Sequence, residues 1–262
     1  MAPVLAIAVI LIIWQTLSVT GTVPKFMLPS PKDVVEAFIK DFPLLMRHTG
    51  TTLTEAFLGL TSGILIGFLV AVLMDRFKIA YRAIYPVLVI TQTIPTVAIA
   101  PLLVLWLGYG VLPKITLIII TSFFPITIGL LDGFRSADSD ALNLMKAMGA
   151  TRMQRFYHIK LPSSLSHFFA GLRISVSYSI IGAVVAEWLG GFSGLGVYMT
   201  RVRKSYSFDK MFAVIFFISL ISLLLMLGVS ALQKAVMPWE KREPKRIAKY
   251  MFKTDKMRWI DQ

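Results

Sequence analysis

Long apolar stretches recur along this chain, and they constrain its fold more than any other feature. A bilayer core is about 30 Å thick, so a helix needs roughly 20 apolar residues to cross it. Lipid offers no hydrogen-bond partner to the backbone, so such stretches are expected to be helical. Of all residues, 56% are hydrophobic and 16% are charged, whereas a soluble domain is about 25% charged. The sequence therefore predicts an all-α integral membrane protein.

Six stretches reach or approach the length of a membrane span, and each is expected to form one transmembrane helix. They lie at about residues 4–19, 49–74, 83–107, 115–131, 168–189 and 211–235. The first is short but lacks a basic leader and a convincing cleavage site, so we expect an uncleaved helix. Between the first two spans, Ser30 and Pro31 are expected to begin a short amphipathic helix. Residues 1–239 are expected to form the membrane domain, and residues 240–262 a basic cytoplasmic tail.

The distribution of basic residues predicts the orientation in the membrane. Of 27 Lys and Arg residues, 17 lie in one alternating set of connections and 9 in the other. The richer set is expected to face the cytoplasm. Both termini and the long connection at 132–166 then lie in the cytoplasm of a bacterial inner or plasma membrane.

Several classes of function are disfavoured by what the sequence lacks. There are no cysteines, and His48, His158 and His167 are far apart without carboxylates at metal-ligand spacing. There is no Walker-type phosphate loop, so the chain is not expected to bind ATP or another cofactor. The net charge of +13 is spread over the connections between spans, which indicates topology rather than nucleic-acid binding. An enzyme is therefore not expected.

The connection at 132–166 is the longest polar-rich segment between apolar stretches. It contains the start and stop residues of two short helices. Ser139 or Asp140 is expected to cap the first helix. Gly149 is expected to end it in a left-handed conformation. Thr151 and Gln154 form a capping-box pattern for the second helix, and Pro162 is expected to stop that helix.

An apolar stripe on the first of these helices needs something to bury it. Ala141, Leu144, Met145 and Met148 recur at helical spacing, with Leu142 beside them. The stripe could pack on the protein's own membrane domain or lie flat in the lipid interface. Alternatively, it could fit into a groove on a soluble partner.

The third span carries polar groups and prolines in the middle of the membrane. Gln92, Thr93 and Thr96 surround Pro95, and Pro101 follows. Proline frees backbone carbonyl groups, which then need a neighbour or water. One interpretation is a kinked packing helix whose threonines bond back to their own carbonyls. The other is that Gln92, Thr93 and Thr96 line a translocation path.

The fifth span also carries small polar residues and one acid. Ser177 and Tyr178 are candidates for the path, although small polar residues also suit close helix packing. Glu187 lies near the outer end of the span. An ionisable residue there predicts a functional role, as a gate or dimer contact, or it is an interfacial carboxylate paired with a nearby base.

A motif in the 132–166 connection resembles that of a known family. Gly149, nine further residues and then Ile159-Lys160-Leu161-Pro162 match part of the EAA loop of permease subunits from binding-protein-dependent ABC importers. Asn143-Leu144-Met145 stands where that family has Glu-Ala-Ala. Residues 91–110 are also similar to the corresponding segment of the taurine/nitrate/sulfonate-type permeases, which include thiamine-precursor permeases. Residues 190–196 resemble the family's outer glycine turn.

This resemblance implies a type I importer permease fold and a set of partners. These are a second copy of the chain, two cytosolic ATPase subunits that bind ATP and Mg, and an extracellular substrate-binding protein. The resemblance assigns coupling to the ATPase to one set of residues: Asp140, Leu142, Leu144, Met145, Met148, Gly149, Ile159 and Pro162.

The predicted function is therefore a translocation path for a small organic nutrient. The first candidate is a pyrimidine-type thiamine precursor, and the alternatives are a sulfonate, taurine, nitrate or bicarbonate. The rival interpretation is a self-sufficient channel or ion-coupled carrier, which would be expected to carry acidic residues at mid-membrane.

Overall fold

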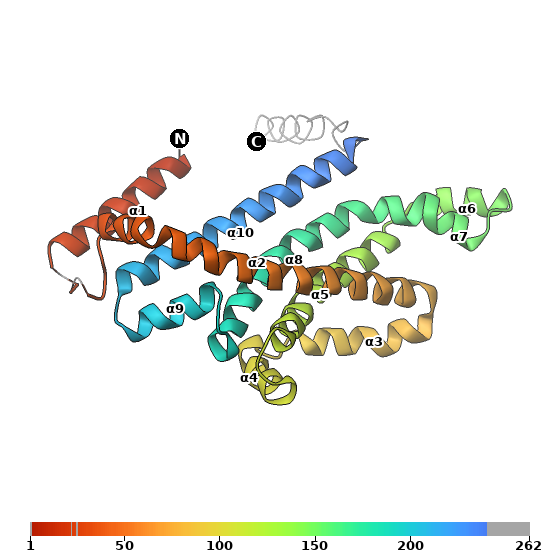
Figure 1. Cartoon of the computed structure of the whole chain (residues 1–262). Coiled ribbons are helices and arrows are strands. Elements are labelled where there is room, and N and C mark those ends of the chain that lie inside the picture. The colour runs from red at the N-terminus through yellow and green to blue at the C-terminus, as the bar shows by residue number, and fades with distance from the viewer. Residues whose placement is uncertain (1, 22, 25, 240–262) are drawn as a thin grey trace, which may run out of the picture.

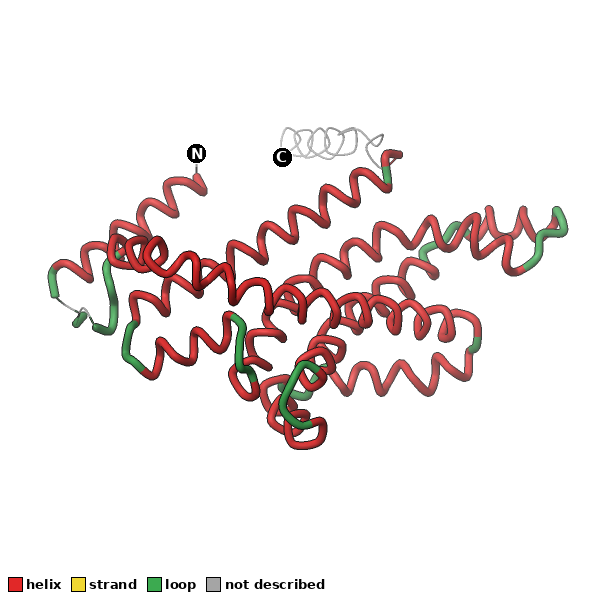
Figure 2. The backbone as a smooth tube through the Cα atoms, in the orientation of Figure 1, coloured by secondary structure: helices red, strands yellow, loops and turns green. Residues whose placement is uncertain are grey.

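The computed structural model describes residues 2–21, 23–24 and 26–239, and these residues form helices joined by short loops without any strand (Figure 2). The predicted all-α fold is confirmed. The predicted basic tail at 240–262 lies outside the described residues. In order, the helices are α1 (Ala2–Val19), α2 (Pro31–Arg76), α3 (Lys78–Thr91), α4 (Thr96–Leu107), α5 (Leu112–Arg135), α6 (Ser139–Ala147), α7 (Arg152–Arg155), the π-helix η1 (Phe156–Lys160), α8 (Leu161–Gly190), α9 (Leu195–Lys204) and α10 (Phe208–Val236).

Four continuous helical stretches within the described residues are long and apolar enough to cross a membrane. They are α2, α5, α10 and the segment from α7 through α8. Helices α3 and α4 together give a fifth candidate span, although they meet at 101°. Helix α1 occupies the place of the first predicted span, and its apolar part is shorter than the others. The count of six spans and the cytoplasmic placement of both termini stay predictions.

Helix α2 is longer than the sequence predicted. Its start is as expected: Ser30 and Asp33 form a reciprocal capping box, and Pro31 occupies the first turn. The predicted break before residue 49 is wrong, because the helix runs unbroken for 46 residues. The polar residues that suggested a loop have partners on other helices. Asp41 accepts a hydrogen bond from Tyr198 at 2.7 Å and pairs with Lys210 at 2.8 Å.

The prediction that Pro162 stops a helix is also wrong. The chain is helical from Arg152 to Gly190, and a single π-helical turn precedes the proline. In that turn the Leu161 N–H donates to the Phe156 carbonyl, five residues back. A wider turn relieves the clash between a proline ring and the carbonyl group four residues before it. The π turn thus lets the helix continue through Pro162.

The long helices lie side by side, and α6 and α7 project from one end of the molecule (Figure 1). Helix α5 packs closely against α8 and α2 because glycines remove side chains at the contacts. A Cβ on Gly171 of α8 would come within 2.4 Å of the Pro125 carbonyl oxygen of α5. The two backbones are therefore in direct contact, as in many membrane helix pairs.

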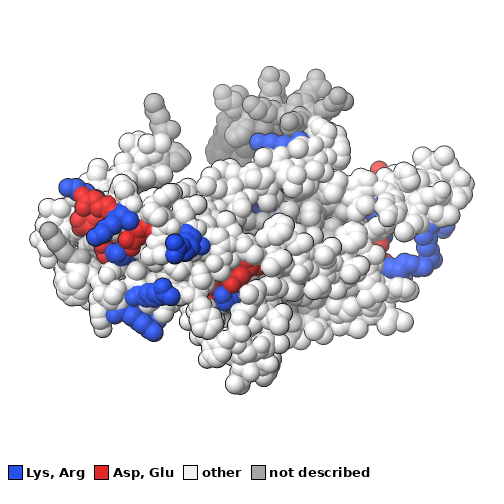
Figure 3. Space-filling view, in the orientation of Figure 1, with Lys and Arg blue, Asp and Glu red and all other residues white. Residues whose placement is uncertain are grey.

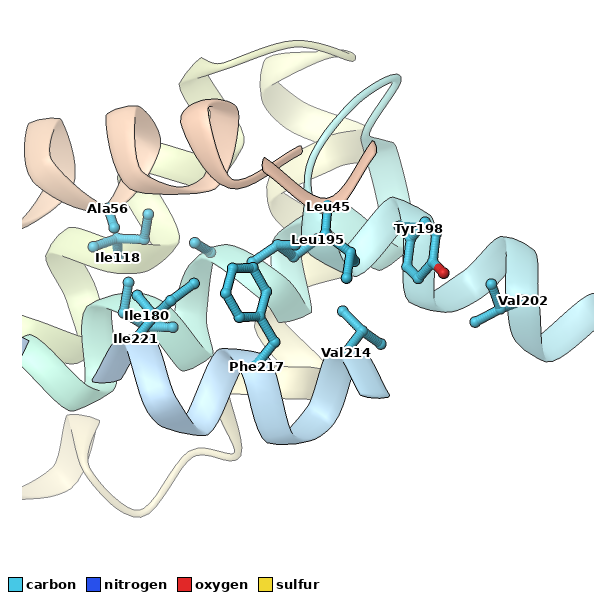
Figure 4. Close-up of a cluster of buried hydrophobic side chains, with 11 residues drawn as sticks. Leu45, Ala56, Ile118, Ile180, Leu195, Tyr198, Val202, Val214, Phe217 and Ile221 are labelled. Atoms are coloured by element: carbon cyan, nitrogen blue, oxygen red, sulfur yellow. The ribbon is translucent and has the colours of Figure 1, made fainter. Parts of the chain in front are cut away.

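A buried apolar cluster joins five helices, α2, α5, α8, α9 and α10 (Figure 4). Leu45 and Ala56 of α2, Ile118 of α5 and Ile180 of α8 meet residues of α9 and α10 there. Tyr198 of α9 belongs to this cluster. Burial and the neighbouring Asp41 carboxylate raise the pKa of the Tyr198 hydroxyl, so it stays protonated and donates to Asp41. The cluster holds α9 against the long helices.

Candidate translocation pocket and coupling segment

The bend between α3 and α4 opens a pocket of about 300 Å³ against α5 and α8. Pro95 stands just before α4 with extended backbone (φ −60°, ψ 121°), so it ends the helical run rather than kinking it. The polar residues that line the pocket are Thr91, Gln92, Thr96, Thr121 and Tyr178. Three of the predicted path residues, Gln92, Thr96 and Tyr178, thus line one pocket.

Some of these polar groups are already satisfied, and others are free to meet a solute. The Thr91 hydroxyl donates to the Leu88 carbonyl at 2.7 Å, and the Thr121 hydroxyl donates to the Ile118 carbonyl at 3.0 Å. The side chains of Gln92, Thr96 and Tyr178 make no hydrogen bond to any other residue in the described part of the chain. These three side chains therefore have polar groups available in the pocket.

Two other predicted path residues lie outside this pocket. Thr93 is exposed, and its hydroxyl donates to the Ile90 carbonyl at 2.8 Å. That is the back-bonding that the packing interpretation predicted. Ser177 is half-buried on α8 and is not part of the pocket lining. Spacing placed both residues near the path but could not fix which side they face.

Glu187 lies near the end of α8, as expected, and its side chain is buried inside the protomer. Its carboxylate is 1% exposed and accepts hydrogen bonds from the Thr52 hydroxyl at 2.7 Å and the Gly196 N–H at 2.6 Å. Among the described residues Glu187 forms no direct ion pair with a base, and its role as a gate or dimer contact stays a prediction. The carboxylate lies at the N-terminus of α9, where negative charge is stabilised. Within the protomer, Glu187 fixes the turn that joins α8 to α9.

That turn requires glycine at one position. Gly194 has φ +127°, and a Cβ there would come within 2.1 Å of the Glu187 carboxyl carbon. Its N–H donates to Nδ1 of His48 at 3.0 Å. The glycine turn expected at 190–196 is thus held against α2 by His48 and against α8 by Glu187.

The connection at 132–166 is the predicted coupling segment. It follows the predicted helix–glycine–helix order, with one change at its start. Asp138, rather than Ser139 or Asp140, caps α6, and its carboxylate accepts from the Asp140 N–H at 2.8 Å. Gly149 ends the helix with φ +81°, as predicted. Thr151 and Gln154 form the predicted capping box.

The apolar stripe of α6 divides between two directions. Leu142 faces the protein's own body, in a cavity with the end of α2 and with α7. Leu144 and Met148 are 63% and 77% exposed, while Met145 is half-buried. The other predicted coupling residues also differ from one another in exposure. Asp140, Gly149 and Pro162 are exposed, and Ile159 is half-buried in the π turn. Helix α6 therefore presents a small apolar surface that nothing in the described chain covers.

Residues 63–242 match the family of binding-protein-dependent transport system inner membrane components. The chain belongs to this family. It is therefore a multi-pass inner-membrane permease subunit of an ABC importer and not an enzyme. The importer interpretation is confirmed, and the rival carrier or channel interpretation is dropped.

The permease has close relatives along nearly its whole length. It is 37% identical over 92% of its length to the formylaminopyrimidine transport permease protein ThiX of Halalkalibacterium halodurans, of which it covers 96%. It is 29% identical over 89% of its length to the taurine transport system permease protein TauC of Escherichia coli, of which it covers 87%.

A solved structure shows the same fold. An inward-facing structure of the MetNI methionine ABC transporter contains a chain that matches this one with a TM-score of 0.66 at 21% identity. The match covers 74% of the permease and 97% of that chain. The expected type I importer permease fold is thus confirmed.

One buried ion pair of the permease escaped the sequence analysis. Lys114 of α5 lies 2.6 Å from Glu55 of α2, and the two side chains are 6% and 3% exposed. The sequence analysis counted Lys114 among the nine basic residues of the outer connections. A lone acid in one apolar span and a lone base at the start of another are a detectable signal, because both need a partner in the membrane.

Proposed function

We propose that this permease imports a small uncharged nutrient, first of all a pyrimidine-type precursor of thiamine. The observation that carries this proposal is the chemistry of the pocket at the α3–α4 bend. An amide, hydroxyls and a phenol ring line it, and none of its lining residues is Asp, Glu, Lys, Arg or His. Tyr178 offers an aromatic face and a hydroxyl, which suits a flat polar ring. The name of the 37% identical relative supports the same substrate class.

Small anions are the competing substrates. Sulfonate, taurine and nitrate carry a negative charge, for which proteins commonly use arginine or lysine. A lining without a cation favours an uncharged solute over these anions and over bicarbonate. The pocket is also small, since its volume of about 300 Å³ is at the lower end of that of common ligand sites.

We propose the assembly that the family name implies, with ATP and Mg bound by partner subunits. Two copies of the permease would enclose the path, two cytosolic ATPases would bind at α6, and a substrate-binding protein would deliver the solute outside. A single copy leaves the pocket open along one side, with Ile94 45% and Tyr178 44% exposed. A second copy would close this side.

Uptake by the reconstituted transporter tests the proposed identity of the substrate. Proteoliposomes with all subunits should accumulate a radiolabelled aminopyrimidine, and excess unlabelled taurine or nitrate should not compete. Replacing Tyr178 by alanine and Gln92 by leucine should each lower uptake about tenfold, because each removes a contact worth roughly 1–2 kcal/mol. Thr93→Val is the matched control, since the Thr93 hydroxyl already donates to the Ile90 carbonyl of α3. Competition by taurine or nitrate, or equal uptake in all variants, would overturn the assignment.

Cysteine crosslinking tests whether a second copy of the permease lies against the open side of the pocket. The chain has no native cysteine, so a single Ile181→Cys or Val97→Cys variant reports only on contacts between copies. Both positions are more than half exposed in one protomer, and we expect oxidation to trap a dimer through at least one of them. Leu223→Cys on α10 is the control that should stay uncrosslinked. A purified complex with one permease copy and full uptake would contradict the homodimer.

A further inference from the structure

A charged cavity of about 510 Å³ lies where α6, α7 and η1 meet the end of α2. Five charged residues line it: Asp75, Arg76, Arg152, Arg155 and Lys160. In the space-filling view, basic side chains gather at this end of the molecule, beneath the projecting α6–α7 segment (Figure 3). The cavity is separate from the pocket at the α3–α4 bend and shares no residue with it.

Most of the positive charge in this cavity has no ion-pair partner among the described residues. Lys160 is neutralised, because its Nζ lies 2.6 and 2.8 Å from the two carboxylate oxygens of Asp75. Among the described residues, no carboxylate forms an ion pair with Arg76, Arg152 or Arg155. The Nε atom of Arg155 is buried without a hydrogen-bond acceptor. A buried donor without an acceptor is costly, so an anion at this site would stabilise it.

An apolar strip leads along α2 to the same cavity. Leu69, Leu73 and Arg76 follow one another at helical spacing and share a face of α2. Leu69 is 67% exposed and Leu73 43% exposed, and Val72 beside them lines the cavity. Phe77 is also 51% exposed at the helix end. An exposed apolar strip on a membrane helix meets acyl chains. Here it ends at Arg76, whose guanidinium lies 5.2 Å from the centroid of the Phe77 ring, and at the cavity that Arg152 and Arg155 also line.

We propose that this cavity binds the phosphate headgroup of an anionic phospholipid, whose acyl chains lie along the Leu69–Leu73 strip of α2. Arginine pairs with phosphate through parallel N–H donors. Basic pockets between membrane helices recognise anionic lipid headgroups in the same way. The lipid would contact α6 on the side where Leu142 faces the cavity. It would leave Leu144 and Met148 exposed for a protein partner.

Native mass spectrometry of the complete transporter tests this site. The transporter is released from nanodiscs that contain equal amounts of phosphatidylglycerol and phosphatidylcholine, and the retained lipids are counted. Wild type should retain phosphatidylglycerol selectively. Arg155→Gln and Arg152→Gln should each lower that retention about fivefold, the effect of roughly one basic residue near an anionic lipid. Arg152 is exposed, so its variant is not expected to disturb folding.

Matched controls distinguish lipid binding in this cavity from a general electrostatic attraction between anionic lipid and basic residues. Arg82→Gln removes the same charge from α3 outside the cavity and should retain phosphatidylglycerol as wild type does. Arg155→Lys should recover part of the binding lost in Arg155→Gln. Equal retention in all variants, or an equal loss in the Arg82 control, would overturn the proposal. Displacement of the lipid by millimolar inorganic phosphate, with the phosphate binding equally well in lipid-free detergent, would instead assign the cavity to a soluble anion.

Discussion

Replacing Lys114 by methionine is expected to destabilise the permease more than any other single substitution considered for its membrane helices. The Lys114 ammonium lies 2.6 Å from the Glu55 carboxylate, and both side chains are almost wholly buried. Removing one partner of a buried ion pair costs about 3–5 kcal/mol, because the other charge is left uncompensated. Among the described residues, the second carboxylate oxygen of Glu55 has no hydrogen-bond partner.

The measurement is unfolding in detergent, followed by tryptophan fluorescence or size-exclusion chromatography after heating. The double variant Glu55→Gln, Lys114→Met removes both charges and should recover most of the loss. Thr116→Val on the same helix is the matched control, because Thr116 bonds only to its own helix at Leu112. If the double variant is as unstable as Lys114→Met, the lysine acts through its packing and not through its charge.

Local signals were predictable from the sequence because they depend on residues a few positions apart. The helix start at Ser30, the capping box at Thr151 and the left-handed Gly149 are of this kind. The error at the start of α6 is one residue, since Asp138 competes with Ser139 for the same N–H groups. The order of the long helices also followed from the sequence, because hydropathy depends on residues that are close together in the chain.

The features that sequence analysis missed depend on contacts between distant residues. Helix α2 continues through Asp41 and His48 because their partners come from Tyr198, Lys210 and Gly194. No local pattern reveals such partners, which lie about 150 residues away. Gln92, Thr96 and Tyr178 were predicted to share a path, but the residues of α5 and α8 that complete their pocket, such as Thr121 and Gly182, are distant in sequence and were not predicted.

The other large effect is expected on α6, at the two side chains that face away from the protein. Leu144 and Met148 stand one helical turn apart and are 63% and 77% exposed. Covering such side chains is worth about 1.5–3 kcal/mol each. Met145 is half-buried and Leu142 faces the body of the permease. If the ATPase subunit binds α6, it is therefore expected to cover Leu144 and Met148 first.

Glutamate at either position should place an unpaired charge in that contact and weaken it at least tenfold. Both substrate uptake and substrate-stimulated ATP hydrolysis by the reconstituted transporter should then fall together, and pull-down of the ATPase should fail. Membrane insertion should not change, because α6 lies outside the candidate spans. Asn143→Glu is the matched control, since it adds the same charge to an exposed position of the same helix, where the EAA motif itself has glutamate. Uptake and ATPase binding at wild-type levels in Leu144→Glu and Met148→Glu would mean that this face of α6 meets lipid or solvent, and that another surface couples the permease to ATP hydrolysis.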